Sequence, residues 1–384
     1  MDEPKRILHV VGAMNRAGTE TMLMNLYRNV NHHKIQFDFV SYSEEEAHYD
    51  HEINELGGKV IRLSQTGSIK ELYQAIKQNG PYEAVHSHTL FHCGIASAAA
   101  YLAGVKVRIS HAHTTSDKDD SRIRKVYIAS MRRMIGTFST HLLACSKEAG
   151  EYLFGKEAIH RSNYSYFPNV IEFEKLLKSP QSLVSQFKIE EGLGKSIVIG
   201  HIGRFIPAKN HDFLLDVMKS LINRNPNYKL LLVGDGDLKN QIEKRIENEG
   251  IKESIRLVGI REDIGTMLHS MDVFVFPSLY EGLGLVLLEA QASGLPCIVS
   301  EAIQPEADLQ LGLVTQLSVR DGPEVWAETI VRQAKRKEKN IHKIKQSFER
   351  NDYSPERGIS KLMNIYGIEI SKGGSNEKSI DRFV

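Results

Sequence analysis

The stretch PSLYEGLGLVLLEAQASGLP, residues 277–296, decides the fold class of this chain. The apolar run DVFVF precedes it at residues 272–276 and is typical of a buried strand, while Gly294 and Pro296 end the helix that the stretch predicts. CIVS, residues 297–300, has the composition of the next parallel strand. Strand, glycine-bearing turn, helix and strand make up one unit of a doubly wound sheet, in which ligands bind at the carboxyl ends of the strands.

The turn of this unit combines an anion site with two carboxylates. We expect the helix to begin near Gly284 or Leu285, so the free N–H groups of its first turn offer a site for phosphate. Glu281 and Glu289 flank that site. A carboxylate beside phosphate is unfavourable unless it binds another part of the ligand, and sugar hydroxyls are suitable donors. Taken alone, the pair could equally be a capping glutamate followed by a solvent-exposed one.

Length and composition narrow the class of protein. With 384 residues and a hydrophobic fraction of 41%, the chain has room for two domains with full cores. Its net charge of +1 gives no general electrostatic case for binding nucleic acid. Cys93, Cys145 and Cys297 are far apart in sequence, which argues against zinc-thiolate sites and disulfide scaffolds and favours the cytoplasm. The N-terminal apolar run is too short for a signal peptide or a membrane span.

Strand and helix patterns alternate in two series along the chain. In the first series, strands are expected at residues 6–11, 37–41, 59–63, 84–86, 105–110 and 142–145, and the second series begins at residue 197. Such alternation predicts parallel sheets in two Rossmann-like domains that face each other. We expect an N-terminal Rossmann-like domain at 1–170, a linker at 171–196, a C-terminal Rossmann-like domain at 197–355, a helix packing back on the first domain at 356–372, and a disordered tail at 373–384.

A cationic segment opens the second series. GRFIPAKNH, residues 203–211, places Gly203, Arg204 and Lys209 directly after the first strand of that half. Arginine can bind phosphate oxygens through two parallel hydrogen bonds, and lysine acts as a point charge. In isolation this spacing is more often a pair of solvated surface cations. Its position relative to the Glu281 segment favours a site that binds a diphosphate.

Two His-x-His pairs, His86 with His88 and His111 with His113, follow strands of the first half. Alternate residues of a strand share a face, so each pair could point toward the same site. Neutral imidazoles are good zinc ligands, as in a metal-dependent hydrolase. They could instead bind sugar hydroxyls, and for His86 and His111 a buried structural role is just as consistent with the sequence.

The spacing of Glu281 and Glu289 within EGLGLVLLEA resembles the signature of the family-4 retaining glycosyltransferases of the GT-B type, and the similarity extends over nearly the whole chain. It is greatest for bacterial exopolysaccharide and capsular polysaccharide members. The resemblance implies an α/β fold of the GT-B class: two Rossmann-like domains with parallel sheets face a central cleft, and a C-terminal helix crosses back. It also implies that the N-terminal domain at 1–170 binds the acceptor and the C-terminal domain at 197–355 binds the nucleotide sugar. EAIQPEADL, residues 301–309, departs from the Gly-Gly variant of sucrose and trehalose relatives, which argues against those substrates.

The family resemblance also implies roles for individual residues. Arg204 and Lys209 would stabilise the leaving diphosphate, Glu281 would bind hydroxyls of the donor sugar, and Glu289 would bind the ribose. His113 matches a histidine that contacts the donor sugar near the reacting centre, with His111 as the weaker match. The remaining donor-binding residues implied are Gly18, Gly203, Ile260, Arg261, Gly284 and Leu285; Ala17 stands where the family has the first glycine of a pair.

The function implied is transfer of a sugar from a nucleoside-diphosphate sugar, expected to be a UDP-sugar, with retention. The acceptor would be a lipid-linked or growing saccharide in extracellular polysaccharide biosynthesis. Asp235 and Asp237 superficially resemble a metal-binding Asp-x-Asp pair, but they follow LLLVG and fit a strand-end turn. We therefore expect no metal requirement and no cofactor beyond the donor substrate. The alternatives are a His-rich metal-dependent hydrolase and a non-catalytic nucleotide-sugar-binding sensor.

One helix of the first half suggests a membrane partner. RIRKVYIASMRRMI, residues 122–135, aligns six apolar side chains on one stripe, and residues 106–133 contain eight Lys and Arg against three Asp. A basic amphipathic helix suits docking on an anionic membrane, here the inner face of the plasma membrane. A core-packed helix with a solvated outer face is the alternative. The apolar positions are Ile123, Val126, Tyr127, Met131, Met134 and Ile135.

Overall fold

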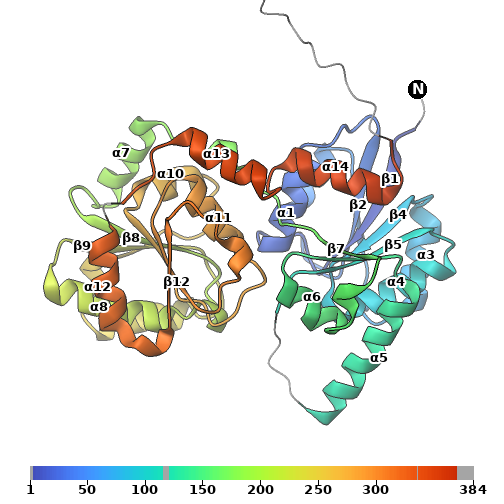
Figure 1. Cartoon of the computed structure of the whole chain (residues 1–384), viewed down its shortest axis with the longest axis horizontal. Helices are drawn as coiled ribbons and strands as arrows, with labels where there is room; N and C mark the ends of the chain where they lie inside the picture. The colour runs from blue at the N-terminus through green and yellow to red at the C-terminus, as the bar shows by residue number, and fades with distance from the viewer. Residues whose placement is uncertain (1–2, 116–120, 335, 370–384) are drawn as a thin grey trace, which may run out of the picture.

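The computed structural model describes residues 3–115, 121–334 and 336–369 and consists of two α/β domains that lie side by side (Figure 1). In the first domain, seven parallel strands form one sheet in the order β3-β2-β1-β4-β5-β6-β7. These strands are β1 (Lys5–Val10), β2 (Ile35–Ser41), β3 (Val60–Arg62), β4 (Ala84–Ser87), β5 (Val107–Ala112), β6 (His141–Ala144) and β7 (Tyr164–Tyr166).

The second domain contains six parallel strands in the order β10-β9-β8-β11-β12-β13. These strands are β8 (Ile197–Ile202), β9 (Tyr228–Val233), β10 (Ile255–Leu257), β11 (Val273–Phe276), β12 (Cys297–Ser300) and β13 (Val314–Leu317). In both sheets the order reverses beside the first strand of the domain, and such a reversal marks the ligand-binding end of a doubly wound sheet. The fold class predicted from sequence is confirmed.

Helices cover the sheets, and alternate strand residues enter different apolar clusters. Phe274 and Phe276 of β11 belong to one cluster, whereas Val273 and Val275 belong to another, so β11 is buried on both faces. This explains why its sequence is continuously apolar. The helices are α1 (Gly18–Tyr27), α2 (Asp50–Glu55), α3 (Ile69–Asn79), α4 (Cys93–Leu102), α5 (Arg122–Phe138), α6 (Lys147–Phe154), α7 (Gln181–Glu190), α8 (His211–Arg224), α9 (Lys239–Asn248), α10 (Ile264–Ser270), α11 (Leu285–Ala292), α12 (Gly322–Gln333), α13 (Ile341–Arg350) and α14 (Pro355–Tyr366).

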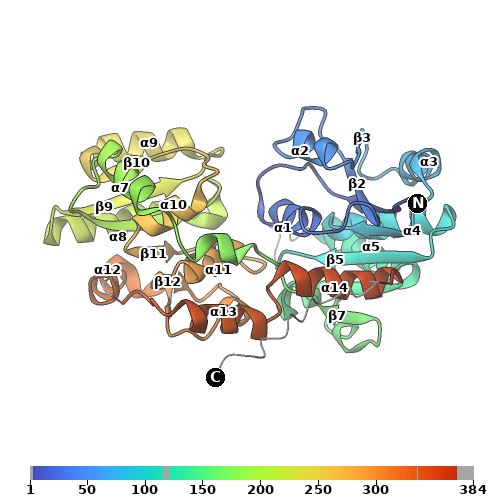
Figure 2. The same cartoon turned by 90° about the horizontal axis from the view of Figure 1, so that it is seen from above.

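The last helix returns to the first domain. Figure 2 shows α13 against the second domain and α14 against the first. A Cβ on Gly358 of α14 would lie 2.6 Å from a methyl carbon of Val170, so only glycine fits this contact. Tyr366 donates or accepts a 2.9 Å hydrogen bond at His86 Nδ1. The predicted return of the C-terminal helix is confirmed. The domain boundaries stay predictions, and the tail at 373–384 lies outside the described residues.

Helix α5 splits its apolar stripe between the core and the surface. Met131 and Ile135 are buried, whereas Ile123 is 85% and Val126 is 72% exposed. The N-terminal part of the helix extends away from the body of the domain (Figure 1). Within the described residues, no helix has the length and apolar character needed to cross a bilayer.

Some short elements, among them β7, β13 and α13, are absent from the sequence-based prediction. β7 and β13 contain three and four residues respectively, and none of these is fully buried, so neither gives a strong alternating pattern. The sequence of α13, IHKIKQSFER, does place Ile341, Ile344 and Phe348 at helical spacing, and Ile344 and Phe348 are buried, so this helix could have been predicted.

Candidate functional site

The central strands of the second domain bring the predicted site residues together. β8 and β11 are hydrogen-bonded neighbours, so the loops that follow them leave the same edge of the sheet. Two hydrogen bonds join these loops: the N–H of Leu279 donates to the Ala208 carbonyl at 2.8 Å, and Asn210 Nδ2 donates to the Pro277 carbonyl at 3.2 Å. The segment that supplies Lys209 is thereby fixed against the loop that supplies Glu281.

Lys209 and Glu281 form an ion pair at this junction. Lys209 Nζ lies 2.5 Å from Glu281 Oε1, and the two side chains are only 15% and 13% exposed. The ammonium also lies 4.6 Å from the centre of the Phe276 ring, within the range of a cation–π contact. Two of the residues predicted to bind opposite parts of one ligand are therefore in direct contact.

The start of α11 is where the sequence predicts the anion-binding part of the site. α11 begins at Leu285, and Gly284 before it adopts a left-handed conformation with φ of 82°. The N–H of Leu287 turns back to the Gly284 carbonyl at 2.9 Å, while helical geometry gives the earlier N–H groups no intrahelical acceptor. These N–H groups, with the positive end of the helix dipole, suit a phosphate.

The first domain approaches this helix start through its own glycine turn. A Cβ built on Gly18, the first residue of α1, would lie 3.9 Å from Leu285 Cδ1. The first residues of these two helices therefore lie next to each other across the domain junction. Gly203, after β8, is close to the same site, because a Cβ there would lie 3.2 Å from Lys209 Cε.

Arg204 is exposed, and its charge acts on a carboxylate of the first domain that the sequence did not single out. Burial raises the pKa of Glu20, in the first turn of α1, to about 7, and the positive charge of Arg204 partly opposes that rise. Sequence inspection could have found Glu20 because it follows the Gly18 turn directly.

Glu289 lies on α11, one turn beyond the helix start. Burial alone raises the pKa of its carboxyl to about 7, with no charged neighbour contributing. A carboxyl in this state is partly protonated at neutral pH and can both donate to and accept from hydroxyl groups.

The end of β5 touches the loop that carries Glu281. Thr115 Oγ1 donates a 2.8 Å hydrogen bond to the Glu281 carbonyl. The carbonyl oxygen of His113 occupies the space that a Cβ at position 282 would need, so Gly282 is required for this close approach. His113 therefore reaches the predicted site through its main chain, while its ring turns toward other histidines.

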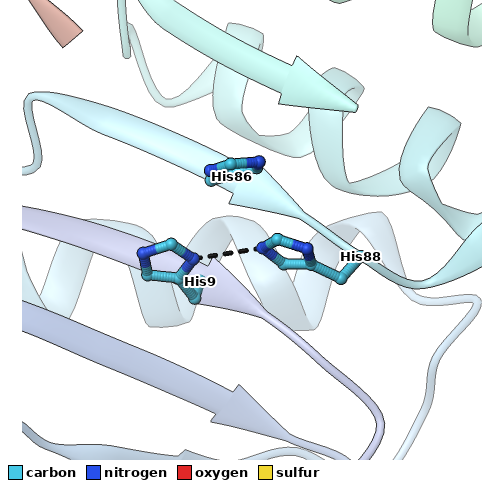
Figure 3. Close-up of side chains that lie close together, drawn as sticks. All are labelled: His9, His86 and His88. Atoms are coloured by element: carbon cyan, nitrogen blue, oxygen red, sulfur yellow. Dashed lines mark hydrogen bonds between the residues drawn. The ribbon is translucent and has the colours of Figure 1, made fainter. Parts of the chain in front are cut away.

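Five histidines gather at the carboxyl ends of β1, β4 and β5: His9, His86, His88, His111 and His113. Figure 3 shows His9 pointing at His88, with Nδ1 and Nε2 3.1 Å apart, and His86 beside them. His88 Nδ1 in turn lies 2.8 Å from His113 Nε2. His9 was not predicted, although it lies near the end of the first strand of the same sheet.

The histidine cluster is the group of described residues whose geometry could hold a metal. His9, His86 and His88 form one trio and His88, His111 and His113 another, with the ligand atoms of each trio within 4.8 Å of one another. Burial lowers the pKa of all five imidazoles, to about 3 for His9 and His113, so they are neutral at pH 7.

The remaining predicted residues lie at the edge of the second domain. Ile260 is 48% exposed in the loop after β10, and Arg261 beside it binds Asp263 with contacts of 2.8 and 2.9 Å. Glu262, which lies between Arg261 and Asp263 in sequence, pairs with Arg16 of the first domain. Asp235 accepts from the Gly236 N–H at 2.7 Å and from Lys239 Nζ at 3.0 Å, which is the hydrogen bonding of a turn.

Both halves of the chain match models of glycosyltransferase families. Residues 16–175 match the model of "Glycosyltransferase Family 4", and residues 185–351 match that of "Glycosyl transferases group 1". EpsF of Bacillus subtilis (strain 168), a glycosyltransferase by name, is 40% identical over 96% of this chain and 98% of its own length. The Escherichia coli UDP-Gal:alpha-D-GlcNAc-diphosphoundecaprenol alpha-1,3-galactosyltransferase is 31% identical over 61% of each chain.

Solved structures agree on the fold. HepE of Anabaena, crystallised with UDP-glucose, superimposes with a TM-score of 0.77 over 94% of this chain and 99% of its own, at 16% identity. The hydrolase alternative accounts for neither family match. The near full-length similarity to EpsF, the two family matches and the GT-B-like architecture show that this chain belongs to the family-4, group 1 glycosyltransferases.

Proposed function

We propose that this glycosyltransferase transfers a sugar from a UDP-sugar, with retention and without a metal ion, to a lipid-linked or growing saccharide in extracellular polysaccharide biosynthesis. The observation that supports this most directly is the contact of Lys209 with Glu281 beside the start of α11. It sets a cation for a diphosphate next to an acceptor for sugar hydroxyls. HepE was crystallised in complex with UDP-glucose, and the name of the Escherichia coli relative gives UDP-Gal as its donor.

The leaving group requires positive charge, because the diphosphate gains negative charge as the glycosidic bond to it breaks. Lys209, Arg204 and the N–H groups of Gly284 and Leu285 supply that charge from two sides. When the donor binds, Lys209 turns from Glu281 to the phosphate, and Glu281 accepts hydrogen bonds from the sugar. Glu289 holds the ribose, and the main chain near Ile260 and Arg261 contacts the base.

Retention follows in this proposal from attack on the face that the diphosphate leaves. The acceptor hydroxyl passes its proton to the departing phosphate oxygen, so no side chain of the enzyme forms a covalent bond to the sugar. His113 contributes its main-chain carbonyl, which lies against Gly282 and can face positive charge developing at the anomeric carbon.

The acceptor is proposed to reach the first domain from a membrane surface. The acceptor named for the Escherichia coli relative is a saccharide on diphosphoundecaprenol. Ile123 and Val126 of α5 are exposed apolar side chains, and Lys125 beside them is exposed too. This combination suits an anionic bilayer at the inner face of the plasma membrane.

Turnover of a panel of UDP-sugars tests the proposal. Purified enzyme is incubated with each donor, a lipid-linked saccharide acceptor and excess EDTA, and UDP release and product are measured together. Transfer in EDTA with an α-linked product from an α-linked donor supports it. A strict metal requirement or a product with inverted configuration contradicts it. Tight donor binding without transfer to any acceptor favours a non-catalytic nucleotide-sugar sensor.

A further inference from the structure

Within the histidine cluster, the hydrogen bonds form two separate chains. The first chain links His9, His88 and His113, with N–N distances of 3.1 and 2.8 Å. The second runs from the Tyr366 hydroxyl to His86 at 2.9 Å and from His86 Nε2 to His111 Nδ1 at 3.2 Å. The first chain ends at His113, and the carbonyl of His113 lies against Gly282.

Counting protons gives the first chain two possible directions. Each neutral imidazole has one N–H, and each of the two links needs one hydrogen. If His88 donates from Nδ1 to His113, then His9 must donate from Nδ1 to His88, and the His113 proton must sit on Nδ1. If His88 donates from Nε2 instead, all three protons move to Nε2. The tautomers of the three rings are therefore coupled.

The surroundings of His113 favour the first direction. His113 Nδ1 and Asn169 Oδ1 are both buried, and neither meets hydrogen-bonding geometry with another described atom. Asn169 lies close enough to His113 to raise the pKa of the imidazole, against the larger effect of burial, which lowers it. A proton on His113 Nδ1 that reached the Asn169 Oδ1 oxygen would give both buried atoms a partner, which the opposite direction would not.

A metal ion fits this cluster less well than the hydrogen-bonded chain does. Both nitrogens of His86 and both nitrogens of His88 already have partners at 2.8 to 3.2 Å, and each candidate trio includes His88. A metal would have to displace at least one of these bonds. The trios also contain no carboxylate to balance a buried dication.

We propose that His9 and His88 are positioning residues that hold the His113 ring as its Nδ1–H tautomer and thereby keep the His113 carbonyl against the Gly282 loop. Their effect on catalysis rests on the proposed function. The path from these rings to the ion pair is short. The hydrogen-bonded rings fix the end of β5, where the His113 carbonyl and Thr115 contact residues 281–282. Glu281 in turn pairs with Lys209. A shift of about 1 Å in such a path can cost on the order of 100-fold in rate.

Substitutions at His88 separate the link to His113 from the link to His9. The amide of His88→Asn falls near the place of Nδ1 and can still donate to His113. The amide of His88→Gln reaches the place of Nε2 and contacts His9 instead. His88→Leu removes both links. The Asn and Gln variants are similar in polarity and both neutral, so they serve as matched controls for each other, with circular dichroism and thermal unfolding to check folding.

Long-range ¹H–¹⁵N correlation spectra of histidine-labelled full-length protein report each tautomer directly. We expect Nδ1–H forms for His9, His88 and His113 in the wild type, with His113 assigned by its loss in His113→Gln. The His113 signal should keep that form in His88→Asn and become a mixture of Nδ1–H and Nε2–H in His88→Gln and His88→Leu, where only Asn169 still favours the Nδ1–H form. Nε2–H forms for all three rings in the wild type, or about one equivalent of bound metal in the purified protein, would overturn the proposal.

Kinetics provide the second readout. We expect kcat to fall by about 10- to 100-fold in His88→Gln and His88→Leu, by less than about 3-fold in His88→Asn, and KM for the donor to change little. Equal kcat in the Asn and Gln variants overturns the positioning role. If the enzyme shows no transfer with any UDP-sugar, the proposed function fails, but the spectra still decide the tautomer claim independently.

Discussion

Lys209 and Glu281 pair across the loops that follow two adjacent strands, with Nζ and Oε1 2.5 Å apart and both side chains largely buried. Each neutralises a charge that would otherwise be costly to bury. The pair also holds the two charges in the positions where a diphosphate and a sugar hydroxyl would use them.

The first prediction concerns this ion pair. Lys209→Met should lower kcat by about 100- to 1,000-fold, because a preorganised charge facing the leaving group is lost. It should also lower the free energy of unfolding by about 1 to 3 kcal/mol, because Glu281 is left unpaired. In the double variant Lys209→Met/Glu281→Gln, stability should partly return while activity does not. Urea unfolding and UDP-release assays measure both effects.

Lys219→Met is the matched control for that prediction. Lys219 pairs with Glu249 at 3.6 Å in a more exposed position, with 44% of the lysine side chain accessible. Its loss should leave kcat unchanged and stability nearly so. Equal loss of activity in the two lysine variants would remove the special role of Lys209.

The second prediction concerns Gly282. Gly282→Ala should abolish most activity, because the added Cβ overlaps the His113 carbonyl and forces the two domains apart at the site. Folding of each domain should persist, since Gly282 lies in a loop between β11 and α11. Gly67→Ala is the control, because a Cβ there meets no atom within 4 Å. Small-angle scattering and activity would be compared, and full activity of Gly282→Ala would contradict the closed arrangement.

The third prediction concerns pH and Glu289. Its folded pKa of about 7 exceeds the ordinary 4.5, so the native state binds more protons than the unfolded chain between those values. This group therefore lowers the stability of the fold as pH rises from about 4.5 to 7. Glu289→Gln should remove that loss and be more stable than the wild type at about pH 8, by up to about 3 kcal/mol, but not at about pH 4.

The same substitution should weaken donor binding, since the introduced amide lacks the negative charge that a carboxylate offers to the ribose hydroxyls. We expect KM for the UDP-sugar to rise by about 10-fold or more while stability at about pH 8 improves. Thermal unfolding at several pH values, beside donor titrations, measures both. A parallel pH dependence of stability in wild type and variant would show that Glu289 is not the titrating group.

The fourth prediction concerns helix α5. Val126→Asp should reduce binding to vesicles that contain anionic lipid, because it puts a charge into the exposed apolar face and opposes the lipid charge. Ile189→Asp on α7 of the linker region is the control, since Ile189 is 76% exposed and lies outside the first domain. Vesicle sedimentation measures binding. Wild-type protein that sediments equally with neutral and anionic vesicles would rule out electrostatic docking.

Much of the fold could be predicted from sequence because both sheets are parallel and buried on two faces. A strand such as β11 has no solvent-facing side, so its apolar residues run without interruption and stand out. The meeting of Lys209 with Glu281 was also predictable in outline, since both follow strands and carboxyl ends of parallel strands share an edge. The apolar sequence pattern is weaker for β7 and β13, because these strands are short and only partly buried.

The histidine chains could not be predicted, because they depend on side-chain rotamers and on the order of strands in space. His9 is 79 residues from His88 in sequence, yet β1 and β4 are neighbours in the sheet. The sequence pattern also could not show that the His113 ring turns inward while its carbonyl meets Gly282. The choice among the interpretations of the His-x-His pairs therefore depends on where the fold places the rings.

The position of α14 has a consequence for biosynthesis. Leu362 and Tyr366 are buried against the first domain, and Tyr366 completes the hydrogen bonding of His86. During translation these residues leave the ribosome only after the whole second domain has been made. Until then, the apolar face that α14 covers on the first domain stays exposed. Premature termination before residue 355 would leave that face accessible to chaperones and proteases.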